Sequence, residues 1–150
     1  MQGLSCYIKN NHVIFHIFGI KIKIRYHGWH MSDYEKLQIF CDIKNLDKLI
    51  SQGLICDHPI GIVAHYKSFG FNNRIYQNVT IGAGKGNKSV FPDEYPVIGN
   101  NIVVYAGAVI CGGIIVGDNS EIGANSVVIN DVPPNAVVAG VPAKVIRYKD

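Results

Sequence analysis

The sequence lacks the features that mark a membrane-spanning or secreted protein. Its longest apolar stretch, residues 102–117, is interrupted by four glycines. It is also shorter than the roughly 20 residues that a membrane-spanning helix needs. The start shows no charged segment followed by an apolar run and a small-residue cleavage site. We therefore expect no membrane span and a cytoplasmic location.

Charge of one sign is not concentrated anywhere along the chain. The 14 Lys and Arg residues face 11 Asp and Glu residues, which gives a formal net charge of +3. Only Lys21, Lys23 and Arg25 form a close basic cluster. Proteins that bind nucleic acid usually carry a basic stripe on one face. The charge pattern therefore predicts no nucleic-acid partner.

Cysteine is scarce and scattered, which argues against disulfides and metal sites. The four cysteines are Cys6, Cys41, Cys56 and Cys111, and no two of them stand in a C-x-x-C pair. No Cys and His residues are clustered at the spacing of a zinc site. We expect buried free thiols and no bound metal.

What the sequence does contain is a repeat of six residues in its last third. An aliphatic residue returns at every sixth position: Ile98, Val104, Ile110, Val116, Ile122 and Val128. An α-helix has 3.6 residues per turn, so it cannot keep this period on one face. A β-helix can, if each hexad is a short strand with its aliphatic residue inward, followed by a turn. The pairs at 100–101, 118–119 and 130–131 contain only Asn and Asp and suit those turns.

The repeat continues upstream with two interruptions. Its register passes through Ile50, Cys56 and Ile62, slips by one residue within 65–68, and resumes at Phe69, Ile75 and Ile81. The segment 83–96 is too polar and too rich in glycine to form a coil of the repeat. We expect it to project as a loop, and projecting loops on rigid scaffolds often carry binding residues.

The first 45 residues do not share the repeat, so we expect a short N-terminal segment (1–45) and a β-helix domain (46–150). Segments 4–9, 13–18 and 20–26 are predicted strands, with a tight turn at 10–11 and apolar and polar residues that alternate in I-K-I-K-I-R at 20–25. Ser32 and Glu35 have the spacing of a capping box, which predicts a short helix from about residue 33 toward 41.

With these features in place, the chain resembles the hexapeptide-repeat acyltransferases, and within them the serine acetyltransferase group. The resemblance covers residues 46–148. It rests on the repeat and on three blocks: D-H-P-I-G-I-V at 57–63, I-Y-Q-N-V-T-I-G at 75–82 and D-V-P-P-N-A-V-V-A-G-V-P-A-K-V-I at 131–146. It implies a mainly β fold, a left-handed parallel β-helix, assembled as a homotrimer. It also implies that acetyl-CoA binds in the groove between neighbouring subunits.

The resemblance also assigns roles to Asp57 and His58, which local sequence alone leaves open. It implies that His58 is the general base and that Asp57 helps to hold the acceptor. A neutral imidazole can take the proton of an acceptor hydroxyl as its oxygen attacks the thioester. For the coenzyme it points to Ala83, Ala106, Ala124 and Lys144. Packing would explain the alanines equally well, and a solvated surface charge would explain Lys144.

One departure from the serine acetyltransferases concerns the acceptor. Those enzymes carry an R-H-P triplet whose Arg grips the amino-acid carboxylate, and here the place reads Glu94-Tyr95-Pro96. A carboxylate at 94 would repel the carboxylate of free serine. We therefore expect a sugar of a surface polysaccharide as acceptor, with Asp93, Glu94 and Tyr95 bonding to its hydroxyls. The alternatives are serine O-acetylation in cysteine biosynthesis, with Glu94 facing solvent, and a scaffold without catalytic activity.

Several other residues are candidates for supporting roles. The resemblance implies an Asp about fifteen residues upstream that orients the base. Asp42 and Asp47 are the candidates, although neither has quite that spacing and Asp47 also suits a turn. His65, Tyr76 and Gln77 are secondary candidates. The zinc carbonic anhydrases that share this type of fold need three imidazole ligands. The repeat here has no histidine after His65, which argues against a zinc carbonic anhydrase.

Overall fold

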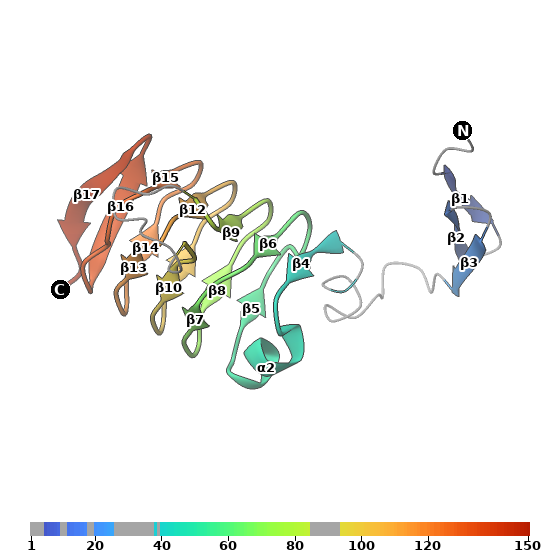
Figure 1. Ribbon diagram of the computed structural model, residues 1–150, viewed down its shortest axis with the longest axis horizontal. Coiled ribbons are helices and arrows are strands. Elements are labelled where there is room, and N and C mark those ends of the chain that lie inside the picture. Colours follow the sequence, from blue (N-terminus) through green and yellow to red (C-terminus); the bar gives the residue numbers. More distant parts are fainter. Residues whose placement is uncertain (1–4, 10–11, 18–19, 26–37, 39, 85–93) are drawn as a thin grey trace. The chain divides into compact units, whose positions relative to one another are not determined.

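The computed structural model describes residues 5–9, 12–17, 20–25, 38, 40–84 and 94–150, which fall into two compact units, 1–35 and 36–150 (Figure 1). The first unit is an antiparallel sheet of order β1-β2-β3, formed by β1 (Ser5–Lys9), β2 (His12–Ile17) and β3 (Ile20–Arg25). The three strands predicted here are confirmed. Of the predicted helix, Gln38 is helical, and residues 33–37 lie outside the described residues.

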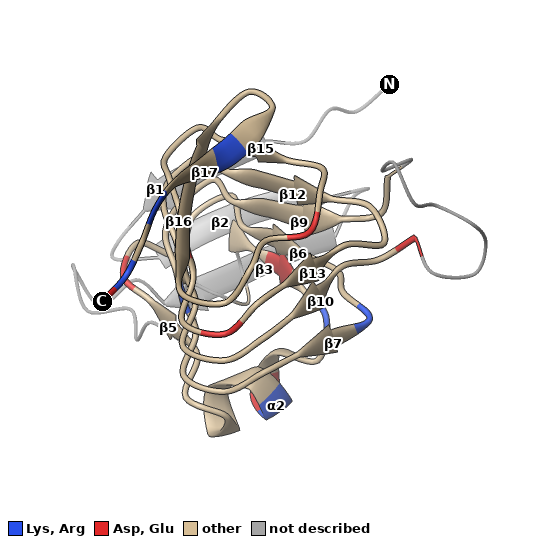
Figure 2. Cartoon of the chain, turned by 90° about the vertical axis from the view of Figure 1, so that its left-hand side faces the viewer, with Lys and Arg blue, Asp and Glu red and all other residues tan. Residues whose placement is uncertain are grey.

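The second unit is a stack of coils whose strands form three sheets, which lie on different sides when the stack is seen end-on (Figure 2). The β9 sheet contains β4 (Asp42–Ile43), β6 (Val63–Ala64), β9 (Thr80–Gly82), β12 (Val109–Cys111) and β15 (Val127–Val128). The β10 sheet contains β7 (Ser68–Phe69), β10 (Val97–Ile98) and β13 (Ile115–Val116). The β8 sheet contains β5 (Ile55–Cys56), β8 (Arg74–Ile75), β11 (Val103–Val104), β14 (Glu121–Ile122) and β16 (Ala136–Gly140), with β17 (Ala143–Tyr148) at its end.

Neighbouring coils pair in parallel, with the repeat's aliphatic residues in register. Val104 lies between Ile75 and Ile122, and Ile110 lies between Ile81 and Val128. The helix α2 (Leu46–Ser51) stands between β4 and β5 in the first coil. The chain therefore forms a parallel β-helix, which confirms the architecture that the six-residue period predicted.

Most hexads bury two positions, not the single one that the period revealed. The second buried residue stands two places before the first, since strand side chains alternate between inside and outside. Such pairs are Val79 and Ile81, Ile102 and Val104, Ala108 and Ile110, Ile114 and Val116, and Ser120 and Ile122. Two upstream assignments were wrong in detail. Ile50 is exposed on α2, where Leu49 packs inward instead, and the residue in register with Ile81 is Ala64, not Ile62.

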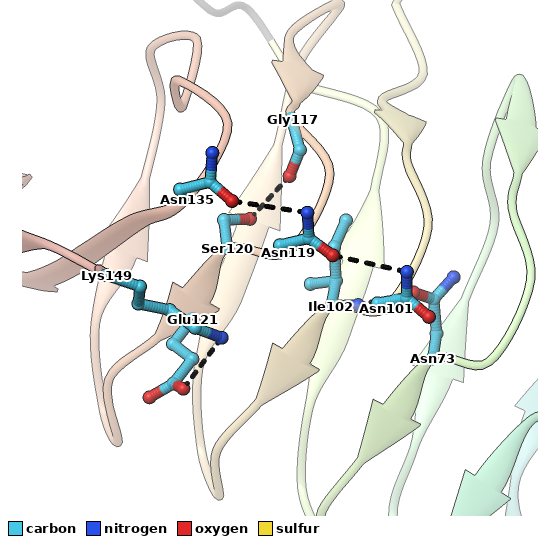
Figure 3. A network of polar contacts seen from close by, with 9 residues as sticks. All are labelled: Asn73, Asn101, Ile102, Gly117, Asn119, Ser120, Glu121, Asn135 and Lys149. Atoms are coloured by element: carbon cyan, nitrogen blue, oxygen red, sulfur yellow. Dashed lines mark hydrogen bonds and ion pairs between the residues drawn. The ribbon is translucent and has the colours of Figure 1, made fainter.

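The turns from the β10 sheet to the β8 sheet carry a ladder of asparagines (Figure 3). Asn101, Asn119 and Asn135 all have left-handed backbones, with φ between 54° and 59°. The Asn101 amide donates to Asn119 Oδ1, and the Asn119 amide donates to Asn135 Oδ1, each at 3.2 Å. Asn tolerates this conformation better than most residues. The turn roles of 101 and 119 are thus confirmed, whereas Asn130 and Asp131 do not adopt a left-handed backbone.

The last coil ends in a hairpin that extends the β8 sheet by one strand. Strand β17 pairs with β16 in antiparallel fashion, the reverse of every other pair in its sheet. Lys149 Nζ lies 3.0 Å from Glu121 Oε1, which ties the end of the chain to the preceding coil (Figure 3).

The cysteines and the membrane prediction have clear outcomes within the described chain. Cys41, Cys56 and Cys111 are free thiols, but only Cys56 is buried, so the expectation of burial was wrong for the other two. Partial burial raises the pKa of the Cys41 thiol by desolvation. No helix among the described residues is long and apolar enough to cross a membrane.

Asn73 stabilises the stack from inside, and we expect its replacement to be costly. The buried Asn73 amide donates to the carbonyls of Gly70 and Gly99, and its oxygen accepts from the Ile102 N–H at 2.8 Å. Asn73→Ala leaves these backbone groups without their partner, which should lower the free energy of unfolding by about 1–3 kcal/mol. Ser120→Ala removes a single bond, to the Gly117 carbonyl, and should cost about 0.5–1.5 kcal/mol. Urea unfolding of both variants tests this ranking, and equal losses would contradict it.

Candidate active site

The turn that carries Asp57 and His58 is longer than the turns stacked on it. Cys56 and Ala64 pair with Ile75 and Ile81 of the next coil. The first two are eight positions apart and the second two are six apart. The corner between the β8 and β9 sheets therefore contains two additional residues in this coil.

Backbone hydrogen bonds show which residues are additional. The Asn78 N–H donates to the Ile60 carbonyl, so residues 60 and onward are again in step with the next coil. Asp57 stands at the position of Tyr76, directly after the inward-facing strand residue, which leaves His58 and Pro59 as the insertion. Pro59 is buried and His58 is exposed. The imidazole of His58, the predicted base, therefore lies outside the interior of the stack, where substrates can reach it.

A charged and aromatic cluster lies beside His58 on the β8 sheet. Arg74 Nη1 lies 2.8 Å from Asp57 Oδ2, and both side chains are partly exposed. The Tyr76 ring stacks on Tyr105 of the following coil with a centroid distance of 5.4 Å. A hydrogen bond with the Tyr76 side chain, and then the charge of Asp57, raise the pKa of Arg74. Arg74 is thus paired with the residue that directly precedes the candidate base.

The same corner also holds two of the residues expected at the coenzyme. The Asn125 N–H donates to the Ala106 carbonyl, so Ala106 and Ala124 lie at matching positions in successive coils. Gln77 precedes them by one coil, because the Gly107 N–H donates to its carbonyl. Its Oε1 is buried with no hydrogen-bond partner in the described part of the chain. A buried acceptor without a donor is costly.

The remaining expected site residues lie elsewhere on the chain. Ala83 follows β9 and Glu94 and Tyr95 precede β10, so these three belong to the corner between the β9 and β10 sheets. Glu94 is half-buried and Tyr95 is exposed. Lys144 is exposed on β17, at the end of the stack. Asp93 lies outside the described residues. Within one chain, the structure thus groups the base with Asp57, Ala106 and Ala124, and not with Ala83 or Glu94.

The two aspartates considered as orienting groups have other positions. Asp42 Oδ2 lies 3.0 Å from Nε2 of His65, which also gives His65 a defined partner on the β9 sheet. Asp47 lies in the first turn of α2, so the turn assignment was wrong. An acidic residue there is favourable for the helix, because it faces the positive end of the helix dipole.

Arg74 is the site residue that sequence reasoning missed. Tyr76 and Gln77 were secondary candidates, but the residue two places before Tyr76, on the strand itself, was not among them. Arg74 stands 17 positions after Asp57. That spacing, and the opposite charges, are the signal that could have found the pair. Among the described residues, no group of three or more His, Cys, Asp or Glu side chains could hold a metal ion.

Comparison with known proteins fits this geometry. Residues 95–130 match the family model described as bacterial transferase hexapeptide (six repeats). The serine acetyltransferase of Synechococcus elongatus is 43% identical over 98 residues, which are 65% of this chain and 39% of that enzyme.

Two solved structures resemble the described fold. The serine acetyltransferase of Neisseria gonorrhoeae in complex with serine aligns with a TM-score of 0.56 and 42% identity, over 63% of this chain and 38% of that one. The Brucella abortus serine acetyltransferase in complex with coenzyme A aligns with a TM-score of 0.58 and 41% identity, over 65% of this chain and 38% of that one.

These matches confirm two expectations. The fold is a left-handed parallel β-helix, and the resemblance to hexapeptide-repeat acyltransferases of the serine acetyltransferase type is confirmed. The chain spans well under half of the length of the enzymes compared above. The family match lies in the later coils, and the identity to the serine acetyltransferases covers about two thirds of the chain.

Proposed function

We propose that this chain is an acetyl-CoA-dependent O-acetyltransferase with His58 as its general base. The observation that carries the proposal is the two-residue insertion that exposes His58 beside Asp57, on a β-helix at least a third identical to serine acetyltransferases. The coenzyme A complex of the Brucella enzyme supports acetyl-CoA as donor. Ala106 and Ala124 lie at the same corner on two successive turns, where their small side chains leave room for a ligand. We propose that acetyl-CoA lies along them.

In this mechanism His58 moves one proton in each direction. The neutral imidazole takes the proton from the acceptor hydroxyl as that oxygen forms a bond to the thioester carbonyl carbon. The carbon–sulfur bond then breaks, and the imidazolium returns the proton to the departing thiolate. Most of the acceleration comes from holding both substrates in attack geometry, for which about 7–11 kcal/mol is available. Backbone N–H groups stabilise the oxyanion.

Serine is the acceptor that the relatives favour. Both solved structures described above are serine acetyltransferases, and one of them holds serine. The sugar acceptor expected from Glu94-Tyr95-Pro96 finds no support among these relatives. It remains a second candidate on one observation, the half-buried carboxylate of Glu94 beside the exposed Tyr95, since such groups suit hydroxyl-rich ligands.

The acceptor is tested by thiol release from acetyl-CoA with serine and with a panel of sugars. We expect turnover with serine that depends on His58. Turnover with a sugar and not with serine would establish the second candidate. No thiol release with either class, from protein that is folded by circular dichroism, would contradict the proposed activity.

The positions of the candidate residues also support a homotrimer with its site between subunits. Ala83, Glu94 and Tyr95 lie at a different corner of the stack from His58, so one chain alone does not bring them together. A neighbouring subunit whose β9/β10 corner faces the His58 corner completes the set. Light scattering should then give about three times the 16.5 kDa mass of the chain. A monomer that is fully active would contradict this assembly.

A further inference from the structure

The antiparallel sheet of the first unit sorts its residues onto two faces of different chemistry. Residues paired across antiparallel strands lie on one face, and neighbours along a strand lie on opposite faces. The register pairs Cys6 with Phe15, and Phe15 with Ile22, so these three share a face. This apolar face consists of the positions Cys6, Ile8, Val13, Phe15, Ile17, Ile20, Ile22 and Ile24. It includes no Lys, Arg, His, Asp or Glu.

The opposite face collects the basic residues of the same sheet. The register pairs Lys9 with His12, and His12 with Arg25, which brings together positions from all three strands. This basic face consists of the positions Ser5, Tyr7, Lys9, His12, Ile14, His16, Lys21, Lys23 and Arg25. The sequence alone shows a basic cluster only at 21–25. The strand pairing adds Lys9 and two histidines to it, so this face has charge of a single sign.

No acidic residue in this part of the sequence balances that charge. Residues 1–32 contain four Lys and Arg residues and no Asp or Glu, whereas residues 33–150 contain all 11 acidic residues. The segment therefore accounts for the whole net positive charge of the chain. Solvated protein surfaces usually intersperse charges of both signs. A face of one sign attracts ligands of the opposite sign, which here means an anionic partner.

The apolar face narrows the choice of anionic partner. A three-stranded sheet is a single layer, and its apolar face is stable only against a second layer or another apolar phase. A second copy of the chain could supply that layer, but it would bring together two segments of the same charge sign, which costs free energy. Nucleic acid would use the basic face alone. A bilayer with anionic headgroups offers partners for both faces.

We infer that the sheet of β1, β2 and β3 binds the surface of an anionic phospholipid bilayer. Packed sheets lie about 10 Å apart, which is therefore about the thickness of one sheet with its side chains. An interfacial element enters about 5–10 Å into the boundary between headgroups and acyl chains. With the apolar face at that boundary, the four cations of the basic face are within reach of the headgroup phosphates. The inference does not depend on the proposed enzymatic activity.

The inference is tested by sedimentation of the full chain with lipid vesicles. We expect binding to phosphatidylcholine vesicles that contain about 30% phosphatidylglycerol, and far weaker binding to phosphatidylcholine alone. Raising the salt from about 0.1 M to about 1 M should release most of the bound protein, because salt screens the cations. Lys21→Gln/Lys23→Gln should weaken binding to the anionic vesicles by about 10- to 30-fold, the usual effect of two cations near such a surface.

Two further variants show whether charge on this face is the cause. Lys48→Gln/Arg147→Gln removes the same number of cations from exposed positions on α2 and β17, and should leave vesicle binding unchanged. Lys21→Arg/Lys23→Arg keeps both charges and should bind like the wild type. Loss of binding in this charge-preserving variant would show that charge on the basic face is not what binds the vesicles.

The remaining outcomes overturn the inference in different ways. No sedimentation with anionic vesicles excludes a bilayer as the partner. Equal binding to vesicles with and without phosphatidylglycerol excludes a role for the cations. Equal losses in Lys21→Gln/Lys23→Gln and Lys48→Gln/Arg147→Gln would mean that net charge alone drives binding. A short DNA duplex that binds as tightly as the vesicles at the same salt would assign the basic face to nucleic acid.

Discussion

Replacing His58 by alanine is expected to lower kcat for acetyl transfer by about 10²- to 10⁴-fold, the usual contribution of a general base. The variant should fold normally, because the imidazole is exposed on an inserted turn and fills no space in the core. The KM for acetyl-CoA should change little, since the lost group acts on the acceptor proton. The measurement is steady-state thiol release at saturating acetyl-CoA.

The neighbouring histidine provides the sharpest comparison for this experiment. His65 is also partly exposed, but it bonds to Asp42 on the β9 sheet. His65→Ala should therefore reduce kcat far less than His58→Ala does. A larger loss at His65 would transfer the role of base to the His65–Asp42 pair. Full activity of His58→Ala would favour a scaffold without catalytic function at this corner.

The second large effect is expected on stability, from Ile110→Ala at the centre of the stack. The Ile110 side chain is fully buried between Ile81 and Val128 of the neighbouring coils. Truncating a buried isoleucine to alanine removes apolar burial and leaves a cavity, which typically costs about 2–5 kcal/mol. We expect the melting temperature to fall by several degrees for each kcal/mol lost.

A matched surface substitution shows whether burial is the cause. Ile146 on β17 is 65% exposed, so Ile146→Ala should change the free energy of unfolding by no more than about 0.5 kcal/mol. Thermal or urea unfolding of both variants gives the comparison. Similar losses for the two variants would mean that Ile146 is buried in the assembled protein.

Much of the β-helix could be predicted from the sequence because its period is local. Strand side chains alternate, and each hexad places an aliphatic residue inside at a fixed interval, so spacing alone predicts the inward positions from Ile98 to Val128. The prediction failed where the chain departs from the six-residue period. Ile50 was assigned inward because the period was continued through α2, where helical geometry turns Leu49 toward the core instead.

The site was only partly predictable, because some of its contacts join residues of different coils. His58 and Asp57 stand in a recognisable block, so they were found, and the exposed position of His58 agrees with that role. The partner of Asp57 comes from the next coil, and the partner of Asp42 is His65, 23 residues later in the chain. Contacts across coils depend on the exact length of each turn. The local sequence does not report those lengths.

The sequence by itself determined the type of fold and the aliphatic interior, since both depend on spacing within a few residues. It also gave the candidate base, through a block that resembles one in a known family. Only the tertiary structure decided which charges meet. The parallel pairing of β5 with β8 brings Arg74 to Asp57 from the next coil, while Glu94 lies at another corner. The physical reason is that hydrogen bonds between neighbouring coils decide which residues meet. Those residues lie far apart in the sequence, beyond the reach of any local pattern.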